Sequence, residues 1–262
     1  MIPALSFILG TLLASFVGVI AQRLHVAPIV NARSKCLSCS HVLSWKDMMP
    51  MASCLLLGGR CRYCQTKFGY SHAFFEFSFG ILFAFLAYKY IVHSESLFSY
   101  VDVLPLVLQM CITICLGVIF LYDIAHRILP KYFLFTFLLL SLFPLLFRVV
   151  ETGSYYELFA PVLVALPYLI LFLLTLGRGV GFGDVLLFFG VGAILGLSSG
   201  FLVFLLSLWI GTLTILPLLY FKVVTKKSLI PFAPFIIISY FLVLFTSFDL
   251  NTLTSFIYRV ML

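Results

Sequence analysis

The sequence predicts an all-α integral membrane protein with about eight transmembrane helices. Of its 262 residues, 63% are hydrophobic and 10% are charged, whereas a soluble domain is usually about half apolar and about one quarter charged. Apolar runs close to the length of about 20 residues that a helix needs to cross a bilayer recur along the chain. Because lipid offers the backbone no hydrogen-bond partners, we expect these runs to be helical.

The apolar runs place the spans at residues 3–22, 73–92, 104–123, 131–149, 158–177, 184–198, 200–221 and 230–248. The short sixth run is divided from the seventh only by the small and polar residues Leu197-Ser198-Ser199-Gly200. We therefore predict three parts: a first transmembrane helix (1–22), a polar loop domain (23–72) and a seven-helix membrane domain (73–262).

The basic residues predict how the chain is oriented in the membrane. With eight spans, thirteen of the sixteen Lys and Arg residues fall in loops on one side. Loops rich in Lys and Arg stay in the cytoplasm, so the loop domain is expected there and both termini outside. The net charge of +7 is thus a topology signal, and we expect membrane lipid and no nucleic acid as a partner.

Two cysteine pairs predict a metal site in the polar loop. Cys36 and Cys39 form one C-x2-C pair, and Cys61 and Cys64 form another. Two such pairs can give one Zn²⁺ its four tetrahedral ligands, and a loop of this size has too little core to fold without a staple. The alternatives are disulfides or unrelated cysteines, but a reducing cytoplasm disfavours disulfides.

Two acidic residues are the candidate reactive groups. Asp184 closes the alternating run Gly179-Val180-Gly181-Phe182-Gly183-Asp184, and Asp123 ends the third span. An acid beside hydrocarbon is a functional-site candidate by default. On the predicted topology both acids lie at one membrane face, as two acids that share a proton require. The alternative is two solvated charges neutralised by Arg127 and Arg178.

A proline-rich segment, Leu229-Ile230-Pro231-Phe232-Ala233-Pro234-Phe235, precedes the last span. Its two prolines, Pro231 and Pro234, predict irregular backbone at the cytoplasmic face. Irregular backbone at membrane depth is tolerated where it is buried in protein or lines a cavity. The alternative is an ordinary helix entry with proline in its first turn.

These segments together resemble the type IV prepilin peptidase family, which are membrane aspartyl proteases with a GxGD signature. Gly181-Phe182-Gly183-Asp184 is similar to that signature. The further segments similar to family patterns are Trp45-Lys46-Asp47, Gly58-Gly59-Arg60-Cys61-Arg62-Tyr63-Cys64, Asp123-Ile124-Ala125-His126-Arg127-Ile128-Leu129-Pro130 and Ile230-Pro231-Phe232-Ala233-Pro234-Phe235.

The resemblance implies an enzyme of the bacterial cytoplasmic (inner) membrane. Asp123 and Asp184 would carry the proteolysis, with active-site loops containing Gly181, Phe182, Gly183, Pro130, Pro231 and Pro234. The substrate would be the N-terminal helix of a prepilin or pseudopilin, cut after its short basic leader at the cytoplasmic face. Zn²⁺ would be structural.

Many members of the family also methylate the new N-terminus with S-adenosylmethionine. This chain differs from the usual family residues at Gly18, Gln22 and Ser71-His72-Ala73, so methylation stays open here. Two functions of other classes also stay open: a proton-coupled transporter, and a non-catalytic zinc-bearing scaffold of a secretion complex.

Overall fold

The structure is a computed structural model that describes residues 1–24, 34–36, 38–67, 70–92, 100–177, 180–222 and 230–246. Within these residues all regular secondary structure is helical, apart from two isolated β-bridges. In chain order the elements are α1 (Ile2–Arg23), η1 (Trp45–Asp47), α2 (Ala52–Leu56), α3 (Ser71–Ala87), η2 (Tyr88–Val92), α4 (Tyr100–His126), α5 (Lys131–Thr152), η3 (Tyr155–Phe159), α6 (Ala160–Thr175), α7 (Phe182–Tyr220) and α8 (Ala233–Thr246). They form two compact units, residues 1–118 and 119–262. The predicted division at residues 22 and 72 stays a prediction.

The predicted all-α membrane fold is confirmed, with six to seven apolar candidate spans. Among the described residues six helical segments are long and apolar enough to cross a membrane, and α8 is a shorter apolar helix. The expected sixth and seventh spans occur within α7, which consists of two helical halves joined at a kink where the backbone of Gly196 is non-helical. A Cβ atom at Gly200 would lie 3.3 Å from Cα of Gly192, so the second half folds back beside the first. The predicted division at Leu197–Gly200 thus lies directly after the observed kink.

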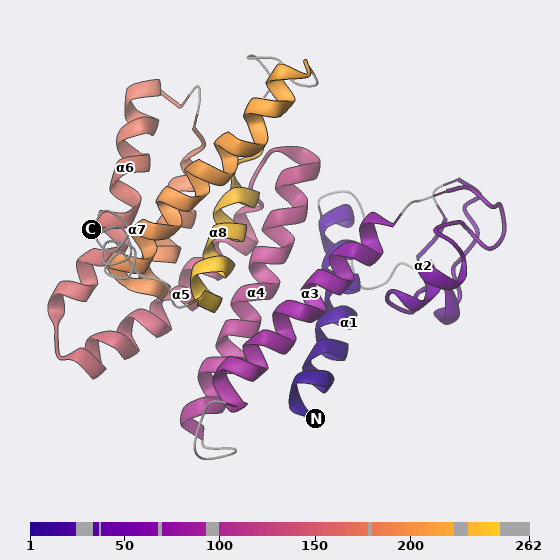
Figure 1. Ribbon diagram of the computed structural model, residues 1–262, viewed down its shortest axis with the longest axis horizontal. Coiled ribbons are helices and arrows are strands. Elements are labelled where there is room, and N and C mark those ends of the chain that lie inside the picture. Colours follow the sequence, from indigo (N-terminus) through magenta and orange to yellow (C-terminus); the bar gives the residue numbers. More distant parts are fainter. Residues whose placement is uncertain are drawn as a thin grey trace, which may run out of the picture. The chain divides into compact units, whose positions relative to one another are not determined.

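In the first unit, α1 and α3 lie side by side (Figure 1) and pack through small residues. A Cβ atom at Gly10 would lie 2.7 Å from Cβ of Phe83 and 3.0 Å from Cα of Gly80. Small residues at a helix crossing let backbones approach closely, which is how helices gain packing contacts in lipid. The loop that contains the four cysteines joins these two helices.

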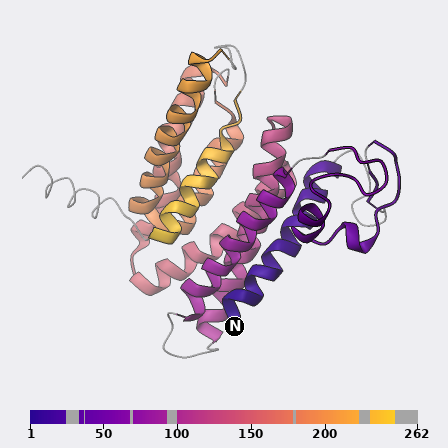
Figure 2. The same ribbon diagram turned by 45° about the vertical axis from the view of Figure 1, so that its right-hand side comes forward.

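In the second unit, α7 is the central helix, and it packs against α5, α6 and α8; Figure 2 shows α7 (orange) and α8 (yellow) side by side. Glycines on α7 make these contacts close. A Cβ atom at Gly192 would lie 2.9 Å from Cα of Pro161 on α6, and one at Gly190 would meet the ring of Phe137 on α5. The glycines thus set how deeply neighbouring helices sit against α7.

We predict that Gly192→Ala destabilises the protein, because the added methyl group would press on the backbone of α6 rather than on a movable side chain. Overpacking of this kind costs about 1–3 kcal/mol. Thermal unfolding in detergent should therefore shift to lower temperature. Gly18→Ala on α1 is the matched control, since no atom lies within 4 Å of its added Cβ. An unchanged or higher melting temperature for Gly192→Ala would contradict the prediction.

Candidate active site and metal site

Asp184 lies at the start of α7. Gly181 is the N-cap residue, and the Asp184 N–H donates to the Gly181 carbonyl at 3.1 Å. The Asp184 carboxylate in turn accepts a hydrogen bond from the backbone N–H of Gly181. An acidic residue in the first turn satisfies free N–H groups and interacts favourably with the positive end of the helix dipole. The helix start thus holds the carboxylate in a fixed orientation.

Two of the predicted loop glycines leave room for this arrangement. A Cβ atom at Gly181 would lie 3.3 Å from Oδ2 of Asp184, and one at Gly183 would lie 2.6 Å from Cδ1 of Leu129. Leu129 belongs to the segment that follows Asp123, so the two motifs pack directly on each other. Phe182, between the glycines, is exposed and its ring lies near that of a phenylalanine on α6. Arg178 and Gly179 lie outside the described residues.

Asp123 lies in the last turn of α4 and is only 5% exposed. Its carboxylate accepts a hydrogen bond from the backbone N–H of Ala233, the first residue of α8. The other oxygen, Oδ2, is buried and has no hydrogen-bond partner among the described residues. Burying an unpaired polar atom is costly, so this oxygen is free to bind a further donor.

Asp123 and Asp184 belong to the same unit and are close enough for their charges to interact. Each receives a backbone N–H from a helix start, at α8 and α7 respectively. The predicted prolines lie in the same segments: Pro130 is the N-cap residue of α5, Pro231 precedes α8 and Pro234 is in its first turn. Leu229, and Lys226 and Lys227 before it, lie outside the described residues.

Tyr168 is a neighbour of this site that the sequence analysis did not single out. It lies on α6, is 4% exposed, and is within electrostatic range of Asp184. Its ring stacks on Phe232 of the proline-rich segment, with centroids 5.3 Å apart, and also contacts Phe188 of α7. The available signal was a tyrosine inside an otherwise apolar run. Tyr168 thereby joins the elements that surround Asp184.

The four predicted metal ligands come together in the first unit. The Sγ atoms of Cys36, Cys39, Cys61 and Cys64 all lie within 4.8 Å of one another, and those of Cys36 and Cys64 are 3.8 Å apart. A tetrahedral zinc with bonds of about 2.3 Å requires sulfur atoms about 3.8 Å apart. The cluster therefore has the dimensions of a four-thiolate metal site.

Both cysteine pairs use the same backbone turn. The N–H of Cys36 donates to the carbonyl of His41, and the N–H of Cys61 donates to that of Thr66, both at 2.9 Å. In each turn the residue four positions after the first cysteine, Ser40 or Gln65, has a φ of 57° or 58°. In each turn this backbone conformation places both thiols on the same side. The equal C-x2-C spacing indicates such a turn but does not define its conformation.

The turns also favour the thiolate form, which binds metal, at Cys36 and Cys64. Backbone N–H groups of Cys39 and Ser38 lower the pKa of Cys36. The hydroxyl and backbone N–H of Thr66 lower the pKa of Cys64 to about 6. At Cys39 the hydrogen bond from the His41 backbone is outweighed by burial and by the neighbouring sulfur atoms of Cys36 and Cys64, which raise the pKa of Cys39 to about 11. The four thiols therefore differ in how readily they lose the proton that metal binding displaces.

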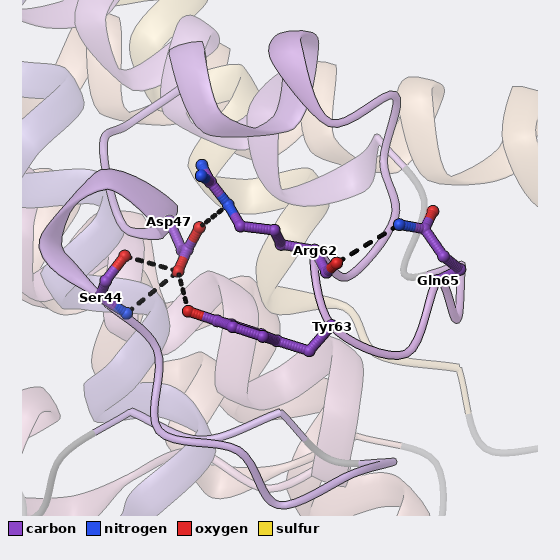
Figure 3. Close-up of polar contacts among 5 residues, drawn as sticks. All are labelled: Ser44, Asp47, Arg62, Tyr63 and Gln65. Carbon is purple, nitrogen blue, oxygen red and sulfur yellow. Dashed lines mark hydrogen bonds and ion pairs between the residues drawn. The ribbon is translucent and has the colours of Figure 1, made fainter.

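A single carboxylate, Asp47, organises the second cysteine pair (Figure 3). Asp47 Oδ1 lies 2.7 Å from Nε of Arg62. Oδ2 accepts hydrogen bonds from the backbone N–H of Ser44 at 3.0 Å, the Ser44 hydroxyl at 2.7 Å and the Tyr63 hydroxyl at 3.4 Å. The side chain of Asp47 is 3% exposed.

The two residues that Asp47 holds, Arg62 and Tyr63, are the two that separate the cysteines of the second pair. The ring of Tyr63 also stacks on His41, which follows the first pair, with centroids 3.6 Å apart. Asp47 thus fixes one turn and, through Tyr63, joins it to the other. Asp47 belongs to one of the segments similar to the family pattern, but its sequence context indicates no role for it.

We predict that Asp47→Asn destabilises this loop at pH 7 by on the order of 1 kcal/mol. The expected effect is no larger because Arg62 is half exposed, and solvent weakens its ion pair with Asp47. The hydrogen bonds from Ser44, and then the Arg62 ion pair, lower the pKa of Asp47. A lowered folded-state pKa stabilises above the unfolded-state pKa of about 3.9, and the gain is lost as the pH falls through the folded-state value. The difference between wild type and variant should therefore shrink below about pH 4.

Fluorescence of Trp45 during denaturant unfolding measures this, in a Trp209→Phe background that leaves Trp45 as the only tryptophan. Equal stability of the two proteins at pH 7 would contradict the assigned role of Asp47.

Comparisons with known proteins agree with this geometry. The model of the Bacterial Peptidase A24 N-terminal domain matches residues 8–90, which include the four cysteines. The model of the Type IV leader peptidase family matches residues 110–216, which include both candidate acids. No solved structure shows a significant match to the chain.

Three curated relatives share the name prepilin leader peptidase/N-methyltransferase. The Vibrio cholerae protein is 28% identical over 257 residues, which cover 91% of this chain and 94% of that protein. The Bacillus subtilis protein is 26% identical over 87% of this chain and 88% of its own length. The Myxococcus xanthus protein is 37% identical over 78 residues, 29% of this chain and 23% of that protein. The chain therefore belongs to the type IV prepilin leader peptidase family, peptidase A24.

Proposed function

We propose that this protein is an aspartic prepilin peptidase in which Asp123 and Asp184 are the catalytic pair. The proposal rests on one observation: two motifs far apart in sequence bring two carboxyl groups close enough for their charges to interact. Each carboxyl group accepts a hydrogen bond from a backbone N–H at the start of a helix. Family membership supplies the reaction, which is removal of the leader from a type IV prepilin. It also favours hydrolysis over the proton-coupled transporter and scaffold alternatives.

Two interacting carboxyl groups can divide the work of peptide hydrolysis. Close like charges separate their ionisation, so one group is protonated while the other is ionised. The ionised group takes a proton from water, which attacks the peptide carbonyl carbon, and the protonated group gives its proton to the carbonyl oxygen. Return of a proton to the leaving nitrogen then breaks the C–N bond. The fixed N–H donors at Gly181 and Ala233 keep both carboxyl groups in place during these transfers.

The substrate that this site suits is an apolar helix with a basic leader. The apolar part can lie in the bilayer beside the equally apolar helices of the second unit, while the leader emerges at the membrane face. Asp123, at the end of α4, and Asp184, at the start of α7, would lie at that face. The basic residues Arg127 and Lys131, between α4 and α5, support a cytoplasmic position for this face by the positive-inside rule, with both termini outside.

We assign Zn²⁺ to the four-cysteine cluster as a structural ion. The support is the sulfur spacing together with the all-thiolate donor set, which is typical of closed structural zinc sites. Cys36, Cys39, Cys61 and Cys64 would hold the ion, which would staple a loop with little core of its own. The ion lies in the first unit and we assign it no step in hydrolysis.

We predict that Asp123→Asn and Asp184→Asn each lower the rate of leader cleavage by at least about a hundredfold, because general acid–base partners contribute roughly 10²–10⁴-fold each. Purified protein in detergent, a prepilin-like substrate and mass spectrometry of the product N-terminus test this. Glu151→Gln, an exposed acid on α5, is the matched control and should cleave normally. Near-normal processing by either aspartate variant would remove that residue from the catalytic pair.

The same spectra address methylation, which the names of the relatives include. With S-adenosylmethionine present, a product heavier by one methylene group at its N-terminus would assign the second activity to this chain. An unmodified product from an active peptidase would restrict the chain to cleavage.

We predict that Cys36→Ser combined with Cys61→Ser removes bound zinc and exposes the loop to proteolysis, because each half of the site loses a thiolate. Metal analysis of purified protein measures the stoichiometry. Cys111→Ser is the control, since this cysteine on α4 lies outside the cluster. Unchanged zinc content in the double variant would refute the assignment.

A further inference from the structure

Gly196 ends the first half of α7, and the second half folds back beside it, since a Cβ atom at Gly200 would lie 3.3 Å from Cα of Gly192. Gly196 has a φ of 82° and a ψ of −175°, a conformation that is essentially restricted to glycine. An interruption leaves the last carbonyl groups of the preceding half, residues 182–195, without their usual helical partners. In a membrane-spanning segment lipid cannot supply replacements, so another part of the protein has to do so.

Arg148 of α5 supplies the missing donors. Its Nη1 donates to the carbonyl of Ile194 at 3.1 Å, and its Nη2 donates to that of Ala193 at 2.6 Å. A cation at a helix C-terminus also interacts favourably with the helix dipole. The planar guanidinium fork suits this task because it presents two donors side by side.

Glu157 of η3 completes the arrangement. Its Oε2 lies 3.1 Å from Nε of Arg148, and the side chains of Glu157 and Arg148 are 29% and 20% exposed. The pair neutralises a charge that would be costly beside hydrocarbon. One guanidinium thus joins three elements, α5, α7 and η3. A Cβ atom at Gly196 would lie 2.9 Å from Nη1 of Arg148, so glycine is needed for close approach as well as for φ.

The position of this cluster connects it to the candidate acids. The half-helix 182–195 carries Asp184 in its first turn and ends at the carbonyls that Arg148 holds. Along its length α5 and the residues just before it contact it in order: Leu129 at Gly183, Phe137 at Gly190, and Arg148 at the end. The same stretch before α5 follows directly from Asp123. The half-helix is therefore held along α5 at both ends.

We propose that Arg148, paired with Glu157, is a positioning residue for the acid pair: by holding the far end of the half-helix 182–195 it fixes Asp184 against Asp123. Arg148 touches no reacting atom and acts only through the helix. This inference rests on the proposed peptidase function. A misplacement of about 1 Å can cost a reaction about a hundredfold in rate, so a holding contact far from the acids has a measurable effect.

The experiment compares Arg148→Met, which keeps much of the side-chain length and removes the donors, with the wild type and with the control Glu151→Gln on the same helix. Cleavage of a prepilin-like substrate gives kcat, KM and the dependence of kcat on pH, and thermal unfolding is measured in parallel. We expect Arg148→Met to lower kcat about tenfold to a hundredfold with little change in KM. We also expect a change in the difference between the two apparent pKa values of the pH profile, because the interaction between the two acids depends on the distance between them.

Glu157→Gln is the milder variant, since it retains an oxygen acceptor, and it should give a smaller change of the same kind. It keeps the inference testable if Arg148→Met does not fold. Normal kcat and pH profile in either folded variant, at temperatures below its unfolding, would overturn the positioning role. Asp184→Asn is assayed alongside: if it cleaves normally, the proposed function itself fails, whatever the Arg148 variants do.

Discussion

The structure of the second unit depends on how helix ends are satisfied where lipid offers no hydrogen bonds. Helix starts carry free N–H groups, and at the starts of α7 and α8 these groups bind Asp184 and Asp123. Helix C-termini carry free carbonyl groups, and at the interruption of α7 these bind Arg148. Carboxylates are therefore bound where helices begin, and a guanidinium is bound where a helical half ends. The same electrostatic rule accounts for the surroundings of both candidate acids and of Arg148.

The sequence was sufficient for the fold class, because long apolar runs have few alternatives to a membrane helix. It also predicted the cysteine quartet, since two equally spaced pairs have one economical arrangement around a metal. The sequence predicted a division of α7 at Leu197–Gly200, directly after the observed kink at Gly196, because glycine and serine are concentrated there. The contact of the Arg148 guanidinium with the carbonyls before this kink was not predicted, because Arg148 is distant in the sequence.

The role of single contacts in the site was beyond the sequence. The GxGD run indicated an acid at a helix start, but not that Leu129 occupies the space above Gly183 or that Ala233 binds Asp123. Tyr168 and Asp47 were missed because their importance comes from neighbours on other elements. Spacing rules describe partners on one helix or turn, whereas these contacts join segments that only the fold brings together.

The interruption of α7 also sets a length. At about 1.5 Å per residue the half-helix from Phe182 to Leu195 extends roughly 21 Å, less than the hydrocarbon thickness of about 30 Å. A half-helix this short cannot place polar groups at both surfaces of an undistorted bilayer. Protein has to shelter its ends, as the enclosed Asp123 and the Arg148–Glu157 pair do, or the surrounding lipid has to thin. Hydrophobic mismatch is thus built into this helix, and a thinner bilayer beside it would shorten the path by which the end of a neighbouring apolar helix reaches the acids.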